Sequence, residues 1–188
     1  MSEVSETVNV TALLNRSRQD PEARERVFRI IYLDLVRLAR RQVGAASRDQ
    51  TLSATSLINE AYLKLQERTG HQWNDRHHFL RVAARAMRQI TIDTIRRKKR
   101  AKRGGDQVDL PLDDARVAGP RKSEMILALE EGLCELAETE PRWVEVIEMR
   151  FFAGLSGQET ADALEVSLSS VNRDWSQARA WMKSFLLE

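Results

Sequence analysis

Apolar residues recur along this chain at spacings of three and four, and few stretches alternate apolar and polar residues as a half-buried strand would. This spacing predicts an all-α fold without a sheet. The expected helices lie at about residues 21–43, 53–67, 79–100, 123–139, 141–152, 156–165 and 168–182. Since 42% of the residues are hydrophobic, such helices can bury real cores.

One stretch of the chain is unsuited to a helix. Residues 104–121 contain a Gly-Gly pair, two prolines and an Asp-Asp pair, with few apolar residues to bury. We therefore predict two helical domains, residues 1–103 and 122–188, joined by a flexible linker at residues 104–121.

The net charge of +2 conceals two halves of opposite sign. Residues 1–120 carry 23 Lys and Arg against 15 Asp and Glu, whereas residues 121–188 carry 7 against 13. Positive charge is densest at residues 96–103, where seven of eight positions are basic. So dense a run at a helix end indicates binding to a polyanion such as nucleic acid. The alternative is a solvated helix end without a ligand.

A helix-turn-helix is indicated in the second half. Ser156 and Glu159 have the form of a capping box, and Ser167 is a good N-cap for the second helix. Glu165 stands in the turn where glycine is usual, at an expected cost of about 1 kcal/mol.

The second helix of this motif has two distinct faces. Its apolar face comprises Val171, Trp175, Ala178 and Met182. Its polar face offers groups that suit the edges of bases in the DNA major groove or the phosphates. The residues expected to contact DNA are Ser169, Ser170, Asn172, Arg173, Ser176, Gln177 and Arg179. The alternative is an ordinary helical hairpin with a polar outer face.

Several functional classes find no support in the sequence. It has no catalytic pair of carboxylates, no nucleophile with a base and no glycine loop for phosphate, so we do not expect an enzyme. The three histidines and Cys134 lack metal-ligand spacing, so neither a metal nor a cofactor is expected. No apolar run approaches the roughly 20 residues that span a bilayer, and the first residues do not resemble a secretory signal. We expect a cytoplasmic protein without a membrane partner.

Three segments, in order, resemble the extracytoplasmic-function (ECF) sigma factors of bacterial RNA polymerase. The sequence LINEAYLKL at 57–65 is similar to the polymerase-binding helix of sigma region two. Residues 79–100, with IDTIRR at 92–97, resemble the promoter-melting segment of that region. Residues 141–182, with EMRFFAGLS at 148–156 and VNRDWSQAR at 171–179, resemble region four.

The resemblance implies an alternative sigma factor that directs promoter recognition, melting and transcription initiation. Its partners would be core RNA polymerase, through the β′ clamp helices and the β flap, and promoter DNA. The first domain would open the −10 element, and the second would read the −35 element. The implied polymerase-binding residues are Ser56, Leu57, Asn59, Glu60 and Leu63. The implied −10 residues are Trp73, Asn74, His77, Arg88, Arg96, Arg97, Lys98 and Arg100. For Trp73, packing onto the core is an equal alternative to stacking on an extruded base.

One departure from the family pattern concerns regulation. The polymerase-binding helix usually begins with an acidic cluster, but here the residues are Ser53-Ala54-Thr55-Ser56. Phosphorylation would restore negative charge at a helix start, where anions are favoured. We therefore expect membership of the ECF groups associated with Ser/Thr kinases, with Thr55 as the first candidate and Ser53 or Ser56 as others. The alternative is that these hydroxyl groups only cap the helix.

Other functions remain open from the sequence alone. A stand-alone helix-turn-helix regulator would bind DNA without polymerase, and a helical interaction module would leave the basic run unexplained. Regulation by an anti-sigma factor is a further possibility. The opposite charges of the two halves also suggest that the second domain docks onto the first in the free protein and masks its DNA contacts.

Overall fold

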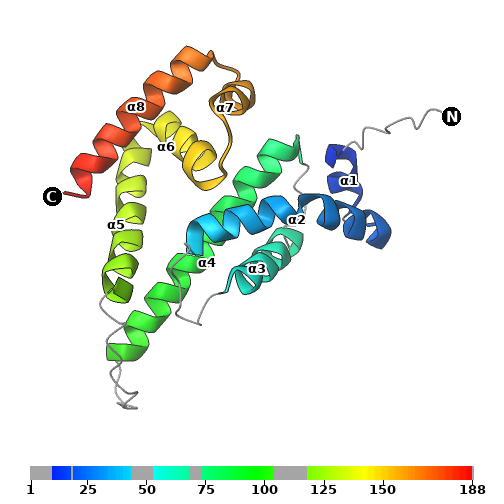
Figure 1. Cartoon of the computed structure of the whole chain (residues 1–188), viewed down its shortest axis with the longest axis horizontal. Helices are drawn as coiled ribbons and strands as arrows, with labels where there is room; N and C mark the ends of the chain where they lie inside the picture. The colour runs from blue at the N-terminus through cyan, green and yellow to red at the C-terminus, as the bar shows by residue number, and fades with distance from the viewer. Residues whose placement is uncertain (1–9, 18, 44–52, 68–72, 104–117, 188) are drawn as a thin grey trace.

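The computed structural model describes residues 10–17, 19–43, 53–67, 73–103 and 118–187 (Figure 1). Every regular element in this part of the chain is helical, which confirms the all-α prediction. The elements are α1 (Val10–Arg16), α2 (Pro21–Val43), α3 (Ala54–Glu67), α4 (Arg76–Arg103), α5 (Ala118–Thr139), α6 (Pro141–Ile147), the π-helix η2 (Glu148–Phe152), α7 (Gly157–Leu164) and α8 (Leu168–Phe185).

Three features differ from the sequence-based expectation. Helix α1 was not expected, and α4 continues without a break through the basic run. Helix α5 begins at Ala118, inside the segment expected to be a linker, while residues 104–117 lie outside the described residues. The helix expected at 141–152 is divided into α6 and η2.

Local capping explains where α2 begins. Asp20 Oδ1 accepts hydrogen bonds from the backbone N–H groups of Glu22 (3.0 Å) and Ala23 (3.2 Å). The hydrogen bond from Ala23 is the main reason that the pKa of Asp20 lies below its ordinary value. Pro21 at the first helical position needs no donor of its own, so this helix start is predictable from three consecutive residues.

Helices α1 to α4 pack together, and we refer to them as the first domain. Helices α2, α3 and α4 pack on one another, and α1 packs on α2. Their apolar stripes meet in a common core. Its most deeply buried members include Leu14, Val27, Ile31, Leu35, Leu57, Ile58, Met87 and Ile90.

Helix α1 holds the segment that leads into α4. The backbone N–H of Trp73 donates to Asn15 Oδ1 (2.7 Å), and Asn15 Nδ2 donates to the Trp73 carbonyl (2.9 Å). The Trp73 ring then packs against Phe79, with 5.0 Å between the ring centroids, and is only 6% exposed. One asparagine therefore satisfies both backbone groups of a buried residue that is outside a helix.

We refer to helices α5 to α8 as the second domain. Helix α6 packs on α5 and α8, and α7 packs on α8. Val146, Ala161 and Val171 form a small core at the helix-turn-helix. No helix in the described part of the chain combines the length and apolar character that crossing a membrane requires.

The two domains lie against each other in this structure. Helix α4 contacts α5, η2 and α7, and α2 contacts η2 (Figure 1). One continuous cluster of buried apolar residues extends from the first domain through Met149 and Phe152 of the second. Gly154 has a positive φ of 74° beside the guanidinium group of Arg41, and a Cβ atom at Gly154 would overlap that group.

We expect Asn15→Ala to lower the free energy of unfolding by about 1–3 kcal/mol, because two hydrogen bonds are lost and the backbone of a buried residue is left unpaired. Urea unfolding followed by circular dichroism measures this change. Asn59→Ala is the matched control, since Asn59 is exposed on α3. Equal effects of the two substitutions would contradict this role of Asn15.

Candidate nucleic-acid interface

Helix α8 separates its two faces as the sequence predicts. Ser167 caps the helix by accepting a hydrogen bond from the Ser170 N–H (3.1 Å). Val171, Ala178 and Met182 are buried, and Trp175 is half-buried. Of the residues expected to contact DNA, Ser170 is half-buried and the rest are exposed, namely Ser169, Asn172, Arg173, Ser176, Gln177 and Arg179.

The turn before α8 has the geometry of a helix-turn-helix. Glu159 N–H donates to Ser156 Oγ (3.2 Å), and Ser156 N–H donates to Glu159 Oε2 (2.7 Å), so both halves of the capping box are present. The backbone hydrogen bond from Ser156 is the largest reason that the pKa of Glu159 is lowered. Glu165 adopts the left-handed conformation (φ 54°, ψ 40°), so it takes the place of the usual glycine without altering the turn.

A buried carboxylate on α8 was missed by the sequence analysis. Asp174 is 1% exposed, and its Oδ2 lies 2.7 Å from Nε of Arg142 on α6. Nε of Arg173 lies 3.5 Å from the other carboxylate oxygen. The signal was available, because Asp174 is three residues after Val171 and four before Ala178 on the apolar face. This ion pair connects α8 to α6.

The half-buried Trp175 lies at the boundary between the buried and exposed faces of α8. The guanidinium groups of Arg150 and Arg179 lie 5.3 Å and 5.6 Å from its ring centroid. Such contacts favour one orientation of each arginine. Arg179 is thereby positioned at the edge of the surface expected to contact DNA.

The C-terminal part of α4 presents a basic surface. Arg96, Arg97, Lys99 and Arg100 are exposed, and Lys98 is half-buried. Arg97 Nη2 donates to Thr94 Oγ1 (3.3 Å) on the same helix. A regular helix therefore presents these cations to solvent, where they can bind phosphates.

The other residues expected at the −10 element do not form one exposed surface. The prediction of base stacking by Trp73 is corrected, because its ring packs in the core and the alternative holds in this structure. Asn74 is exposed, whereas Nε2 of the half-buried His77 lies 3.5 Å from Glu159 Oε1 on α7. Arg88 is largely covered by the second domain, at 2.9 Å from Glu148.

The face expected to bind polymerase lies on α3. Ser56, Asn59 and Leu63 are exposed and Glu60 is half-buried, but the prediction for Leu57 is wrong because its side chain is fully buried. Leu57 supports α3 from within the core. The segment singled out by the sequence resemblance is helical, but the resemblance did not separate this inward-facing residue from its neighbours.

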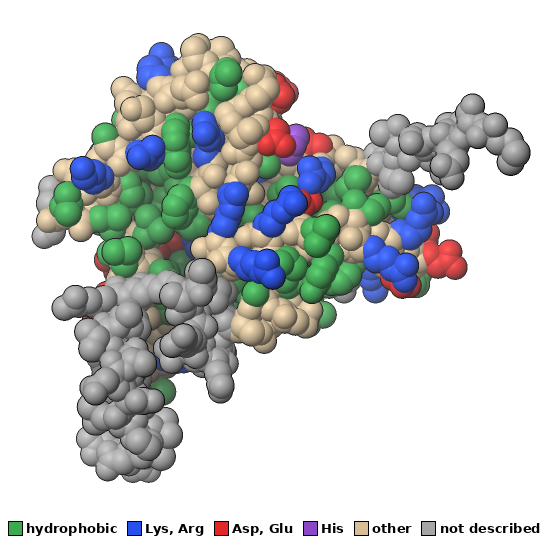
Figure 2. Space-filling view, in the orientation of Figure 1, with side chains coloured by type: hydrophobic (Ala, Val, Ile, Leu, Met, Phe, Trp, Pro, Cys, Tyr) green, Lys and Arg blue, Asp and Glu red, His purple; other side chains and the backbone are tan. Residues whose placement is uncertain are grey.

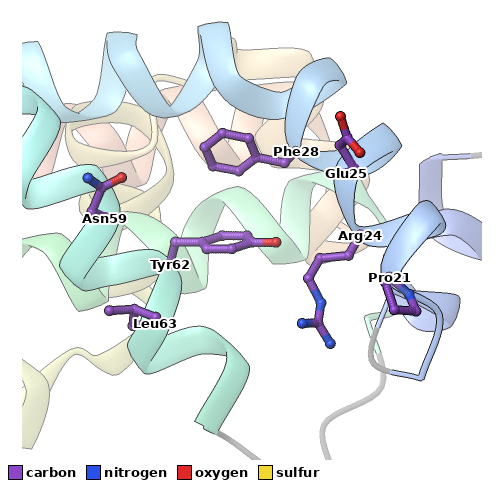
Figure 3. Close-up of a pocket in the computed structure, with 7 residues that line it drawn as sticks. All are labelled: Pro21, Arg24, Glu25, Phe28, Asn59, Tyr62 and Leu63. Carbon is purple, nitrogen blue, oxygen red and sulfur yellow. The ribbon is translucent and has the colours of Figure 1, made fainter.

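A shallow groove runs beside this face, between α2 and α3 (Figure 3). Asn59, Tyr62 and Leu63 line it from α3, and Pro21, Arg24, Glu25 and Phe28 line it from α2. The rings of Phe28 and Tyr62 meet edge to face at 4.9 Å between centroids. Leu63 is 58% exposed at the rim, so the groove offers apolar contact to a partner.

The outer face of α2 extends this surface and was also missed by the sequence analysis. Apolar and basic side chains are interspersed there, as the space-filling view shows over α2 (Figure 2). The exposed members are Arg26, Arg29, Ile30, Leu33, Arg37 and Arg40. Their spacing of three and four is a signal that could have revealed it. In the ranges that the structure describes, no cluster of His, Cys, Asp and Glu is suited to a metal ion.

The chain matches a known family. The family model described as ECF sigma factor matches residues 7–187, which is nearly the whole chain. No curated protein and no solved structure matches the chain significantly.

We expect Glu165→Gly to raise the free energy of unfolding by roughly 1 kcal/mol, because glycine adopts the left-handed conformation without the steric cost of a Cβ atom. Thermal or urea unfolding provides the measurement. Glu165→Ala is the matched control, since alanine removes the charge but keeps the Cβ atom. A gain of equal size in both variants would show that the charge, not the backbone, is responsible.

Proposed function

Since the chain belongs to the ECF sigma factor family, it is an alternative sigma factor for transcription initiation, and we propose that its two domains divide promoter recognition between them. The first domain, α1 to α4, binds polymerase and the −10 element. The second, α5 to α8, binds the −35 element. The observation that carries this division is α8, whose buried and hydrogen-bonding faces separate within a complete helix-turn-helix.

The exposed face of α8 is suited to the DNA major groove. Asn172 and Gln177 can each both donate to and accept from a base edge, and Arg173 can donate two hydrogen bonds to guanine. Serine hydroxyl groups at 169 and 176 can bond either bases or phosphates. This mixture supports sequence-specific reading by the second domain, although the domain itself is acidic.

The basic end of α4 is suited to the phosphates of a melting duplex. Arg96, Arg97, Lys99 and Arg100 provide positive charge on exposed helical turns. Asn74, two residues before the start of α4, is exposed and available to an extruded base. Trp73 contributes instead by holding this segment onto the core.

The α3 face and the adjoining groove are proposed to bind the β′ clamp helices. Exposed apolar side chains on α3 and α2 provide the buried centre of such an interface, and polar groups surround them. The second domain would contact the β flap. The start of α3 offers hydroxyl groups where the family usually places carboxylates, so the first turn of this helix carries no negative charge.

We propose that phosphorylation of Thr55 by a Ser/Thr kinase supplies the missing charge. Ser53 Oγ caps α3 by accepting from the Ser56 N–H (3.0 Å), and its hydroxyl group bonds Ser56 Oγ (3.0 Å). Thr55 is exposed and has no hydrogen-bond partner for its hydroxyl group among the described residues. A phosphate there would lie in the first turn of α3, where the helix dipole favours anions.

We expect binding to core RNA polymerase to increase when Thr55 carries negative charge. The measurement compares unmodified protein, kinase-treated protein, kinase-treated Thr55→Ala and Thr55→Glu by fluorescence anisotropy. Thr139→Glu, which adds the same charge at an exposed position on α5, is the control. Equally tight binding by the unmodified protein would remove the phosphorylation proposal. Binding in no form, with specific DNA binding by the protein alone, would favour a stand-alone regulator.

We expect Arg173→Ala to weaken binding of the holoenzyme to its promoter by about 5- to 150-fold, corresponding to roughly 1–3 kcal/mol for one base-reading side chain. The promoter is one selected from genomic DNA by the wild-type holoenzyme. Lys183→Ala, at an exposed position in the last turn of α8, is the control for loss of positive charge. Equal losses would indicate a non-specific electrostatic contact, contrary to base reading.

A further inference from the structure

We propose that the free protein adopts a closed state, in which the second domain docks onto α4 through an ion-pair cluster centred on Arg88. The closed state leaves the α3 face open and covers part of the −10 surface. Its consequence for transcription rests on the proposed function, whereas the docking itself does not.

Arg88 connects three elements. Its Nη2 donates to Glu148 Oε1 on η2 (2.9 Å), and its Nε lies 3.4 Å from Glu130 Oε2 on α5. Its guanidinium group also lies 4.9 Å from the centroid of the Phe152 ring. The side chains of Arg88, Glu148 and Glu130 are 12%, 10% and 15% exposed. A charge pair this sheltered from water specifies one arrangement of the domains more strongly than a surface pair does.

The remaining ion pairs between the domains have the same polarity. Arg81 lies 3.5 Å from Glu145, Arg85 lies 3.9 Å from Glu148, and His77, which is charged only when protonated, lies 3.5 Å from Glu159. In each pair within the described residues, the first domain supplies the basic side chain and the second supplies the carboxylate. These rim contacts contribute little individually, but they match the opposite charges of the two halves.

Apolar and shape contacts complete the interface. Phe152 and Met149 belong to the buried cluster that continues from the first domain. On the other side, the Arg41 guanidinium group occupies the space that a side chain at residue 154 would need, and Gly154 leaves that space open. The docking therefore combines apolar burial with charge, and salt alone would not abolish it.

The Arg88 cluster is incompletely satisfied, which allows it to open. Arg88 Nη1 is buried without a hydrogen-bond partner among the described residues, and so is Glu130 Oε2, despite its proximity to the Arg88 Nε. A partly satisfied polar network is less stable than a saturated one. A DNA phosphate offers the arginine a bidentate partner, so DNA can compete with the two glutamates for Arg88.

The closed state prevents one of the expected DNA contacts. Arg88 was expected to bind the −10 element, but in the closed state its guanidinium group is bonded to Glu148 and largely covered. The connecting segment 104–117 can span up to about 50 Å when extended, so the domains have enough chain between them to separate. Polymerase binding at the exposed α3 face can precede this opening.

Double electron–electron resonance between two spin labels tests the closed state. Cys134 is exposed on α5 and is the natural thiol of the second domain, and Lys64→Cys on α3 provides the other site. We expect one narrow distance distribution for the otherwise unchanged protein. Glu130→Gln with Glu148→Gln should broaden it and shift it to longer distances. Glu131→Gln with Glu135→Gln is the matched control, since it removes two exposed charges from α5.

A broad distribution in the otherwise unchanged protein would overturn the closed state. An unchanged distribution in the Glu130 and Glu148 variant would overturn the role of the Arg88 cluster. If circular dichroism shows that this variant does not fold, the distances are measured in Arg88→Gln instead, because this substitution on α4 removes the same contacts. An unchanged distribution in Arg88→Gln would likewise overturn the role of the cluster. The measurement needs neither polymerase nor DNA, so its result is independent of the proposed function.

Discussion

Helix α4 is the constraint on which the rest of the structure depends. Its 28 residues extend about 42 Å at 1.5 Å per residue, further than one small core can cover. The apolar stripe packs on α2 and α3, the arginines of the middle section bind carboxylates of the second domain, and the basic end faces solvent. One continuous helix therefore links the core, the docking surface and the proposed phosphate-binding surface, and a change in its direction would alter all three.

Sequence patterns that act over a few residues predicted most of the fold. Periodicity located the longer helices, and side chains such as Asp20, Ser156 and Ser167 marked where helices begin. Helix α1 was missed because it is only 7 residues long, and its role depends on Asn15 pairing with a residue 58 positions away. No local pattern encodes such a pair. The π-helix was also missed, and its buried residues lie where it packs against α4, far away in the sequence.

The residues of the candidate site were predictable where their exposure follows the periodicity of a helix. The sequence of α8 places apolar residues on one side of the helix and polar residues on the other. In the structure, the polar residues expected to contact DNA are exposed, except for the half-buried Ser170. Leu57 and Trp73 were assigned from family resemblance, which identifies a segment but does not distinguish a core side chain from a contacting one. Arg88 was expected to contact DNA. In the structure it pairs with Glu148, which is 60 positions away in the sequence, so no local pattern predicts the pair. The proposed competition between DNA and Glu148 for Arg88 therefore becomes visible only in the tertiary structure.

The π-helix has a consequence for how insertions and deletions would act on this protein. A π turn holds an additional residue within a helix, compared with an α-helical turn. Deleting one residue from 148–152 would remove this wider turn and change the relative positions of Glu148 and Phe152, which both contact Arg88. The surface that meets α4 is therefore sensitive to a change of one residue in the length of this segment.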